Sequence, residues 1–450
     1  MTFENIIYLI VLILWLLAAI QGLRAFGGAI RSYRYMSRMA DPSRDLLSES
    51  GEFNYHPKAA VILPCCGVDE KLEQTVQALA RQNYPDLEVI FTFESNDDPA
   101  YAAIGAWMKD LFHDGDSEAP SVCGTGCGTG VSPVNSPARR RCHTCRRVVA
   151  GLADRRSQKI HNLLAAVEEV SKDRKVLAFL DSDAVPGKDW LGHLVAPLRD
   201  ETVGAATGYR WYGATGGLAA GVRCAWNAAA VSLMDDEKQN FCWGGATAIR
   251  RETFRSLGVA RYWDRALSDD LQLTRAVRDA GLRIHFVPQA LVSSSDGTTL
   301  WGFWSFARRQ MIISRICAPA MWWSNLILVC NFVTGGTAVA ALFFVAAMGW
   351  SGGKTAMIAA LFGWLFVLSL AAGIALARQL ALRKVLHPPD LTWRDFCWDV
   401  AGTVVFSGLL HLNLFAASLT SRRIIWRNTE YELVSADETR VVRRLDSNGR

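Results

Sequence analysis

The sequence carries little charge for its length. Only 20% of its 450 residues are Asp, Glu, Lys or Arg, whereas half are hydrophobic and 16 are Trp. This composition is apolar for a soluble protein of this size, and Trp is enriched at membrane interfaces. The net charge is only +5, so charge alone gives no reason to expect a nucleic-acid partner. Composition therefore favours a chain that contacts a membrane.

The sequence also lacks a disulfide framework. Eleven cysteines are present, but four of them lie in one unusual segment, and the others are single or form the pair Cys65-Cys66 in apolar surroundings. Isolated cysteines of this kind are typical of reduced core residues. We therefore expect a domain that faces the cytosol.

The first apolar run, residues 6–20, contains no charge. With its flanks to about residue 26 it can cross a bilayer, which needs ~20 residues. It lacks the basic start and the small-residue cleavage site of a signal peptide. Only Glu4 precedes it, whereas five arginines follow it: Arg24, Arg31, Arg34, Arg38 and Arg44. The positive-inside rule then places the following domain in the cytoplasm, at the inner membrane if the source is bacterial.

Three further apolar runs lie late in the chain, at about 324–348, 356–377 and 400–418. Basic residues follow the second run, which fits a return to the cytoplasm. A full crossing by the third run would leave Arg422, Arg423 and Arg427 outside, against the same rule. The third run is therefore either a full span or a re-entrant or interfacial segment.

Between the membrane segments, short apolar runs alternate with amphipathic ones. The pattern predicts strands at 59–63, 87–93 and 175–180 and helices at 72–82 and 160–170. Alternating units of this size predict an α/β fold with a doubly wound, largely parallel sheet. Such sheets bind ligands at the carboxyl ends of their strands. Pro64, Glu94 and Asp181 end the three strands, so we expect them to border one crevice.

Acidic residues recur near these strand ends. They form three groups: Asp97-Asp98, Asp181 with Asp183, and Asp269-Asp270. A basic cluster, Arg308-Arg309-Gln310, follows in an aromatic stretch. Each group has a simple interpretation by itself: solvated loop acids, acids at a helix start, or a basic membrane anchor. Lys159 could likewise be a solvated lysine at a helix start. Together, acids with Mg²⁺ or Mn²⁺ and facing arginines suit a substrate that carries a diphosphate.

Six segments in order resemble one family. They are PCCGVDEKL (64–72), YPDLEVIFTFESNDDPA (84–100), QKIHNL (158–163), FLDSDAVPGKDWL (179–191), CWGGATAIRRETF (242–254) and SDDLQLTRAVRDAGLRI (268–284). The set is similar to membrane-bound family 2/21-type glycosyltransferases of the GT-A fold, especially ceramide glucosyltransferases and hopanoid-associated bacterial relatives. The resemblance implies inverting transfer of a sugar from a nucleotide sugar, UDP-glucose or a related UDP-hexose, to the hydroxyl of a ceramide-like membrane lipid.

The resemblance also implies roles for single residues. Asp98 would lie on the nucleotide side, Asp181 and Asp183 would hold the metal and the donor diphosphate, and Asp270 would be the general base. The other expected donor-binding residues are Pro64, Lys159, Arg308, Arg309 and Gln310. The family's closing motif, Q/R-x-x-R-W, lacks its Trp in this chain, because residues 306–311 read FARRQM.

Residues 114–157 interrupt the resemblance and are rich in Gly, Ser, Pro and Arg. Such a stretch cannot bury enough surface to order itself, which favours a flexible surface insertion. Its cysteine pairs, Cys123 with Cys127 and Cys142 with Cys145, leave a zinc ribbon as the alternative.

The predicted organisation follows from these segments. It comprises an N-terminal transmembrane helix (1–26), a juxtamembrane linker (27–57), a GT-A-like catalytic domain (58–300), an interfacial aromatic and basic segment (301–323), a C-terminal membrane region (324–420) and a polar tail (421–450). Two other functions stay open. One is a processive polysaccharide synthase, which would need a transmembrane channel. The other is a non-catalytic membrane binding protein on a decayed transferase scaffold.

Overall fold

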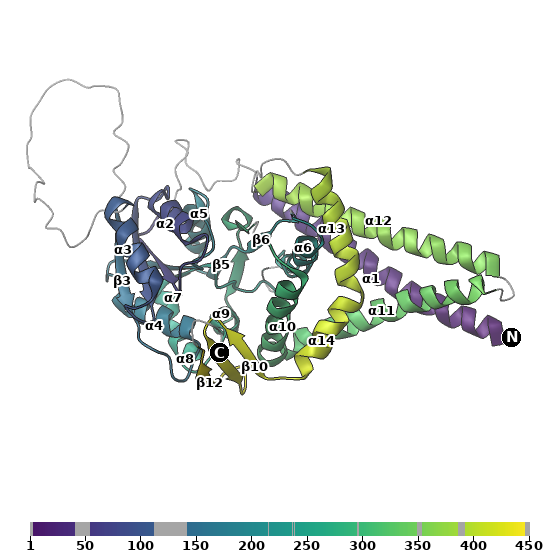
Figure 1. Ribbon diagram of the computed structural model, residues 1–450. Helices are drawn as coiled ribbons and strands as arrows, with labels where there is room; N and C mark the ends of the chain where they lie inside the picture. The colour runs from purple at the N-terminus through teal and green to yellow at the C-terminus, as the bar shows by residue number, and fades with distance from the viewer. Residues whose placement is uncertain are drawn as a thin grey trace, which may run out of the picture.

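The computed structural model describes residues 3–40, 55–111, 142–214, 216–235, 237, 239–294, 297–348, 353–385 and 392–445. An α/β domain lies at one end, and long apolar helices extend from it (Figure 1). This arrangement confirms the predicted fold class.

A mixed sheet with the strand order β3-β2-β1-β4-β7-β5-β8 forms the centre of the domain. Its strands are β1 (Ala59–Pro64), β2 (Asp86–Phe93), β3 (Cys142–Val149), β4 (Val176–Leu180), β5 (Val203–Thr207), β7 (Ala246–Arg250) and β8 (Arg283–Phe286). All neighbours pair in parallel except β7, which runs antiparallel to β4 and β5. The predicted largely parallel sheet is therefore present, with one reversed strand.

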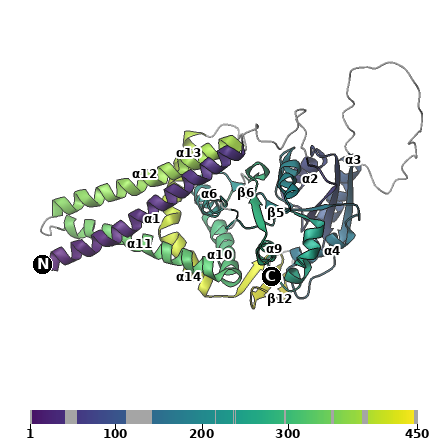
Figure 2. The same ribbon diagram turned by 180° about the vertical axis from the view of Figure 1, so that it is seen from behind.

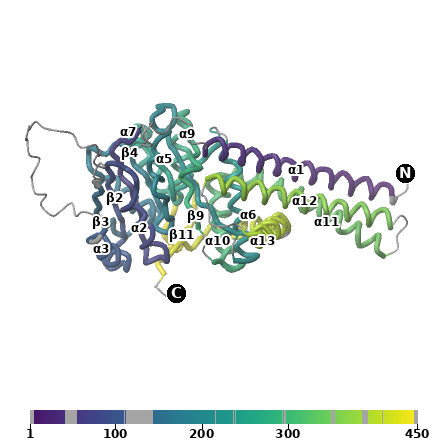
Figure 3. The backbone as a smooth tube through the Cα atoms, turned by 90° about the horizontal axis from the view of Figure 1, so that it is seen from above, coloured from purple at the N-terminus to yellow at the C-terminus, as the bar shows by residue number. Residues whose placement is uncertain are grey.

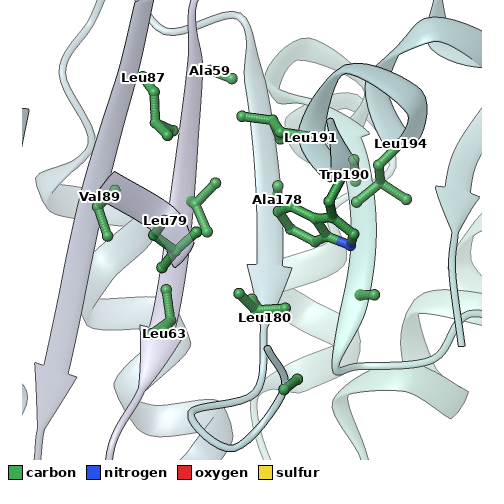
Figure 4. Close-up of a cluster of buried hydrophobic side chains, with 14 of the residues drawn as sticks. Ala59, Leu63, Leu79, Leu87, Val89, Ala178, Leu180, Trp190, Leu191 and Leu194 are labelled. Atoms are coloured by element: carbon green, nitrogen blue, oxygen red, sulfur yellow. The ribbon is translucent and has the colours of Figure 1, made fainter. Parts of the chain in front are cut away.

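The central strands are apolar on both faces because helices cover both. The helices of this domain are α2 (Leu72–Ala80), α3 (Pro99–Leu111), α4 (Gln158–Glu169), α5 (Trp190–Val195), α7 (Arg251–Ser256), α8 (Val259–Trp263) and α9 (Asp269–Asp279). On β1, Val61 belongs to the core cluster with α2 and α5, and the next residue, Ile62, belongs to the cluster with α4. Figure 4 shows the first cluster, where Leu79 of α2 and Trp190 of α5 lie over the strands. Burial on two faces explains the unbroken apolar runs of the sequence.

Within the described residues, three helices are long and apolar enough to cross a membrane, by length and composition. They are the spans Asn5–Met39 within α1 (Phe3–Met39), Pro319–Ala347 (α11) and Lys354–Val385 within α12 (Gly353–Val385). They run side by side away from the α/β domain, with the N-terminus at the far end (Figure 3). Helices α6 (Leu218–Val231) and α10 (Leu300–Cys317) lie between this bundle and the sheet (Figure 2).

The third late apolar run forms a bent pair of helices. α13 (Trp393–Val405) and α14 (His411–Leu419) are joined by a short π-helical segment (Phe406–Leu410), and the pair bends by 44°. Gly408 departs from helical backbone angles at this break. A broken span and a re-entrant segment both fit this geometry, so the two interpretations of the sequence stay open.

The boundaries differ from the predicted organisation at three places. α1 continues through residues 27–39, which were expected to be linker, because Met36 packs against Ala381 and Leu382 of α12. Residues 142–149, which were assigned to the insertion, form the edge strand β3. Cys145 of this strand is only 4% exposed and belongs to the apolar core. Cys123 and Cys127 lie outside the described residues.

The third difference concerns the expected polar tail. It contains an antiparallel sheet of β10 (Arg423–Trp426), β11 (Thr429–Leu433) and β12 (Thr439–Arg444), here called the C-terminal meander. Its inward residues Ile424, Tyr431 and Leu433 pack on Leu267 and Ile312. These inward residues follow the period of two that a half-buried strand requires, although charged residues between them hide the pattern.

Candidate active site

In the described part of the chain, a large cavity borders the carboxyl ends of the parallel strands. Its volume is about 1840 Å³. Seven predicted site residues line it: Pro64, Lys159, Asp181, Asp183, Asp270, Arg309 and Gln310. The structure therefore brings together most of the site that the sequence predicts.

Each carboxylate after β4 has its own cation. Lys159 Nζ lies 2.9 Å from Asp181 Oδ1. Arg210 Nη1 donates to Asp183 Oδ2 at 2.8 Å, and Nη2 contacts the other oxygen. Burial opposes ionisation of Asp183, but the hydrogen bonds and charge of Arg210 outweigh it and hold the pKa of Asp183 below its ordinary value. Arg210 thus explains how two acids are tolerated at one strand end.

Lys159 is buried between two carboxylates. Besides Asp181, it lies 3.2 Å from Asp269 Oδ2. Burial opposes its charge, yet the surrounding aspartates raise the pKa of Lys159, so it stays protonated. Burial raises the pKa of Asp269 to about 6 even though Lys159 pulls it down. The arrangement gives Lys159 and Asp269 the role of orienting Asp181.

Two glycines let the carboxylates approach the backbone. A Cβ on Gly244 would lie 2.2 Å from Asp269 Oδ2, and one on Gly245 would lie 2.5 Å from Asp181 Oδ2. No side chain fits at either position without displacing these acids. The segment CWGGATA, which is part of the family resemblance, contains both glycines. The sequence alone did not explain why glycine is needed at these positions.

Asp270 opens α9 beside its buried neighbour Asp269. Ser268 is the N-cap residue, and its hydroxyl accepts from Leu271 N. Asp270 Oδ1 accepts from Leu271 N at 2.8 Å and from the Ser268 hydroxyl. Among the described residues, no hydrogen bond to Asp270 Oδ2 is found. Asp270 lines the cavity, so this oxygen is available to a substrate proton.

Two predicted donor-binding residues point elsewhere. The Asp98 carboxylate accepts from Gly67 N at 3.0 Å and Ala100 N at 2.8 Å, and it is absent from the cavity lining. Through these hydrogen bonds Asp98 connects the loop after β1 to the start of α3. Arg308 is also outside the lining and extends toward Thr420, with 3.4 Å between Nη2 and the hydroxyl.

The helix period explains why Arg308 and Arg309 differ. Adjacent residues of an α-helix are rotated by about 100°, and Arg308 falls just outside the face of α10 that lines the cavity. Phe306, Arg309, Gln310 and Ile313 recur at spacings of three and four and line the cavity together. The prediction that Arg308 binds the donor is therefore not supported by its position, whereas Arg309 is well placed.

The cavity also extends away from the carboxylates into the membrane bundle. Its lining there includes Ala18 and Gly22 of α1, Val329 and Val333 of α11, and Ala371 of α12. Trp322 and Phe415 pack together beside it, with ring centroids 5.1 Å apart. A polar site and an apolar passage thus form one continuous space.

Two basic residues of this site were not predicted from the sequence. Arg210 lies on the short strand β6 (Arg210–Tyr212), which pairs with β9 (Val292–Ser294) outside the main sheet. Arg427 belongs to the C-terminal meander and forms two hydrogen bonds with Asp69, of 2.8 and 2.7 Å. Both arginines reach the site through tertiary contacts, which no local pattern encodes.

The carboxylate pair fits a divalent cation shared with a substrate. Asp181 and Asp183 are 28% and 34% exposed at their side chains. Among the described residues, no group of three or more His, Cys, Asp or Glu side chains forms a protein-only metal site. Mg²⁺ and related cations often take one or two carboxylates and complete their shell with substrate phosphates, which matches this donor set.

Comparison with known proteins identifies the family to which the chain belongs. The model of glycosyl transferase family 21 matches residues 20–113 and 143–439. This is a family of nucleotide-sugar glycosyltransferases, and the match covers most of the chain. The protein belongs to glycosyl transferase family 21. No curated protein matches the sequence.

Solved structures give more distant similarities. The mannosyltransferase PcManGT from Pyrobaculum calidifontis, in complex with GDP-Man and Mn²⁺, is 17% identical with a TM-score of 0.47, over 87% of this chain and 98% of its own. Glucosyl-3-phosphoglycerate synthase from Mycobacterium tuberculosis, in complex with Mn²⁺, UDP and phosphoglyceric acid, is 15% identical with a TM-score of 0.32, over 57% of this chain and 76% of its own.

Proposed function

We propose that the protein transfers a sugar from a nucleotide sugar, UDP-glucose or a related UDP-hexose, to the hydroxyl of a ceramide-like membrane lipid, with inversion at the sugar carbon. One observation carries the proposal: the cavity that holds Asp181, Asp183 and Asp270 continues between the apolar helices. A water-soluble donor and a hydrophobic acceptor can therefore meet within one space. UDP-glucose and ceramide are the substrates that the sequence resemblance implies.

The chemistry follows from the positions of the acids. The lipid hydroxyl oxygen attacks the anomeric carbon while Asp270 Oδ2 accepts the hydroxyl proton. The bond from the anomeric carbon to the phosphate oxygen breaks, and its electron pair leaves with the nucleoside diphosphate. Direct attack from the side opposite to the leaving group inverts the configuration. Asp270 acts as a general base in this step.

The charge on the leaving diphosphate needs compensation. Asp181 and Asp183 would hold Mg²⁺ or Mn²⁺, which supplies positive charge to the phosphate oxygens when bound. Arg309 faces the same region and adds a guanidinium, which binds phosphate well. Pro64 and Gln310 border the same space. We place the α/β domain on the cytoplasmic side, as the arginines after the first apolar run favour.

The experiment offers the enzyme several donors and acceptors. Membranes from expressing cells would be incubated with radiolabelled UDP-glucose, UDP-galactose and GDP-mannose, each with ceramide, diacylglycerol or a hopanoid. Membranes with equal amounts of the Asp270→Asn variant are the control. A labelled, organic-soluble lipid supports the proposal. Label in an insoluble polymer would instead indicate a processive synthase, and the absence of any product would indicate a binding protein.

A further inference from the structure

The C-terminal meander is attached to both helices that carry the acid–base machinery. Gln158 N, at the start of α4, donates to the Tyr431 hydroxyl at 3.1 Å. Arg275 of α9 pairs with Asp437 at 2.6 Å. Figure 1 shows β10 and β12 beside α9. The meander is therefore part of the wall of the active site, next to the residues flanking Lys159 and Asp270.

One turn of the meander has an unusual backbone. Trp426 pairs with Thr429, so Arg427 and Asn428 form a two-residue hairpin turn. Arg427 has φ 53°, and it is the one non-glycine residue with positive φ in the described part of the chain. Such turns favour Gly, Asn or Asp, because a larger side chain is strained in this region. An arginine side chain does not stabilise this turn conformation, so the presence of arginine at position 427 needs another explanation.

Arg427 lines the same cavity as the acids after β4, Asp181 and Asp183. It is held by both oxygens of Asp69, in the loop after β1. The Ser182 hydroxyl, between Asp181 and Asp183 in sequence, donates to Asp69 Oδ2 at 3.2 Å. Arg309 lies across Trp426, 5.9 Å from its ring centroid. Arg427 and Arg309 thus approach the same region from two elements.

The charges of the site leave a role for this guanidinium. Lys159 and Arg210 are each engaged by buried or half-buried aspartates of the site, and Arg308 extends away from it. Arg427 and Asp183 line the same cavity, and Asp69 joins Arg427 to Ser182, the residue before Asp183. A diphosphate bound at Asp183 would therefore lie near Arg427.

We propose that Arg427 binds the donor diphosphate, and that Asp69 orients its guanidinium until the donor enters. A guanidinium presents paired N–H groups that match phosphate oxygens as well as they match a carboxylate. Exchange of Asp69 for phosphate therefore keeps the same geometry. This inference rests on the proposed function, because it needs a nucleoside diphosphate in the cavity.

The test measures nucleotide binding to the full-length protein in detergent with Mn²⁺. UDP and GDP are titrated into the wild type by calorimetry, and the tighter ligand is used for the variants. Arg427→Gln should weaken binding roughly 10- to 100-fold, as expected for the loss of a charge-assisted pair. Arg427→Lys should recover part of the loss. Asp69→Asn should bind as tightly as the wild type or more tightly, because it releases the guanidinium.

A matched control lies on the same meander. Arg443 is 62% exposed and pairs with Glu430, so Arg443→Gln should leave affinity unchanged. Unchanged binding by Arg427→Gln would overturn this inference and leave the proposed function standing. Equal losses of nucleotide affinity in Arg427→Gln and Asp69→Asn would also overturn it. They would show that the Arg427–Asp69 pair only holds the loop after β1 in place. If the wild type binds neither UDP nor GDP, the proposed function fails together with this inference.

Discussion

Replacement of Asp270 by Asn tests the proposed chemistry most directly. Asn keeps the size of the side chain, and its oxygen can still accept from Leu271 N, as Asp270 Oδ1 does at 2.8 Å. It cannot accept the proton of the lipid hydroxyl. General base catalysis contributes roughly 10²- to 10⁴-fold in rate, which corresponds to about 3 to 5 kcal/mol of transition-state stabilisation. We expect transfer to fall by that factor while donor affinity is retained.

The adjacent Asp269 provides the comparison. It is 4% exposed and forms an ion pair with Lys159, so the lipid hydroxyl has less access to it. Asp269→Asn removes one ion-pair partner of Lys159 but leaves it Asp181. Its single-turnover rate should fall much less than that of Asp270→Asn.

The assay is single-turnover transfer, measured beside donor affinity and melting temperature for both variants. Near-normal transfer by Asp270→Asn would refute the assignment of the base. A defect of Asp270→Asn confined to donor binding would refute it equally. A larger chemical defect in Asp269→Asn would move the role of base to that residue.

Three further predictions concern the metal, the insertion and pH. UDP affinity should fall when a chelator removes Mg²⁺ or Mn²⁺ or when Asp183 is replaced by Asn, and equal calorimetric affinities with and without chelator would exclude a metal role. Deletion of Ser117–Arg141 should leave transfer largely intact, because long surface insertions cost little; one equivalent of bound zinc in elemental analysis, together with lost activity, would contradict this. The pKa of Asp269 rises on folding from an ordinary 3.8 to about 6, so the folded state binds more protons in that range and this group's contribution to stability falls as pH rises through it. The melting temperature of Asp269→Asn minus that of the wild type should therefore increase between pH 4 and pH 6 and level off above.

The strand-end residues could be predicted because their positions depend on local patterns. A parallel α/β sheet places the ends of its strands at one edge, so apolar runs that stop at Pro64 and Asp181 locate the crevice without any knowledge of tertiary contacts. The sequence pattern marked Asp269 and Asp270 as acids at the start of an amphipathic stretch, and only the family resemblance singled out Asp270. The positions of these residues along the chain already determine which side of the sheet they occupy.

Other parts of the site depend on contacts between distant segments. Arg210 reaches Asp183 from a strand of three residues, too short to give a periodic signal. Arg427 follows three late apolar runs and looks like part of a basic tail, so only its packing places it beside Asp69. Arg308 was assigned to the wrong side because the phase of α10 is set by what packs on it, and the sequence RRQ does not reveal which residue faces inward.

The paired acids after β4 now have a physical explanation that the sequence could not supply. With Lys159 beside Asp181 and Arg210 on Asp183, the negative charge of both carboxylates is compensated before any ligand arrives. A metal ion alone would therefore have to compete with a buried guanidinium for Asp183. A metal ion that arrives with a diphosphate brings phosphate oxygens as additional ligands, and the phosphate offers Arg309 and Arg427 new partners. Because these gains occur only together, we expect the site to favour the metal–nucleotide complex over either component alone.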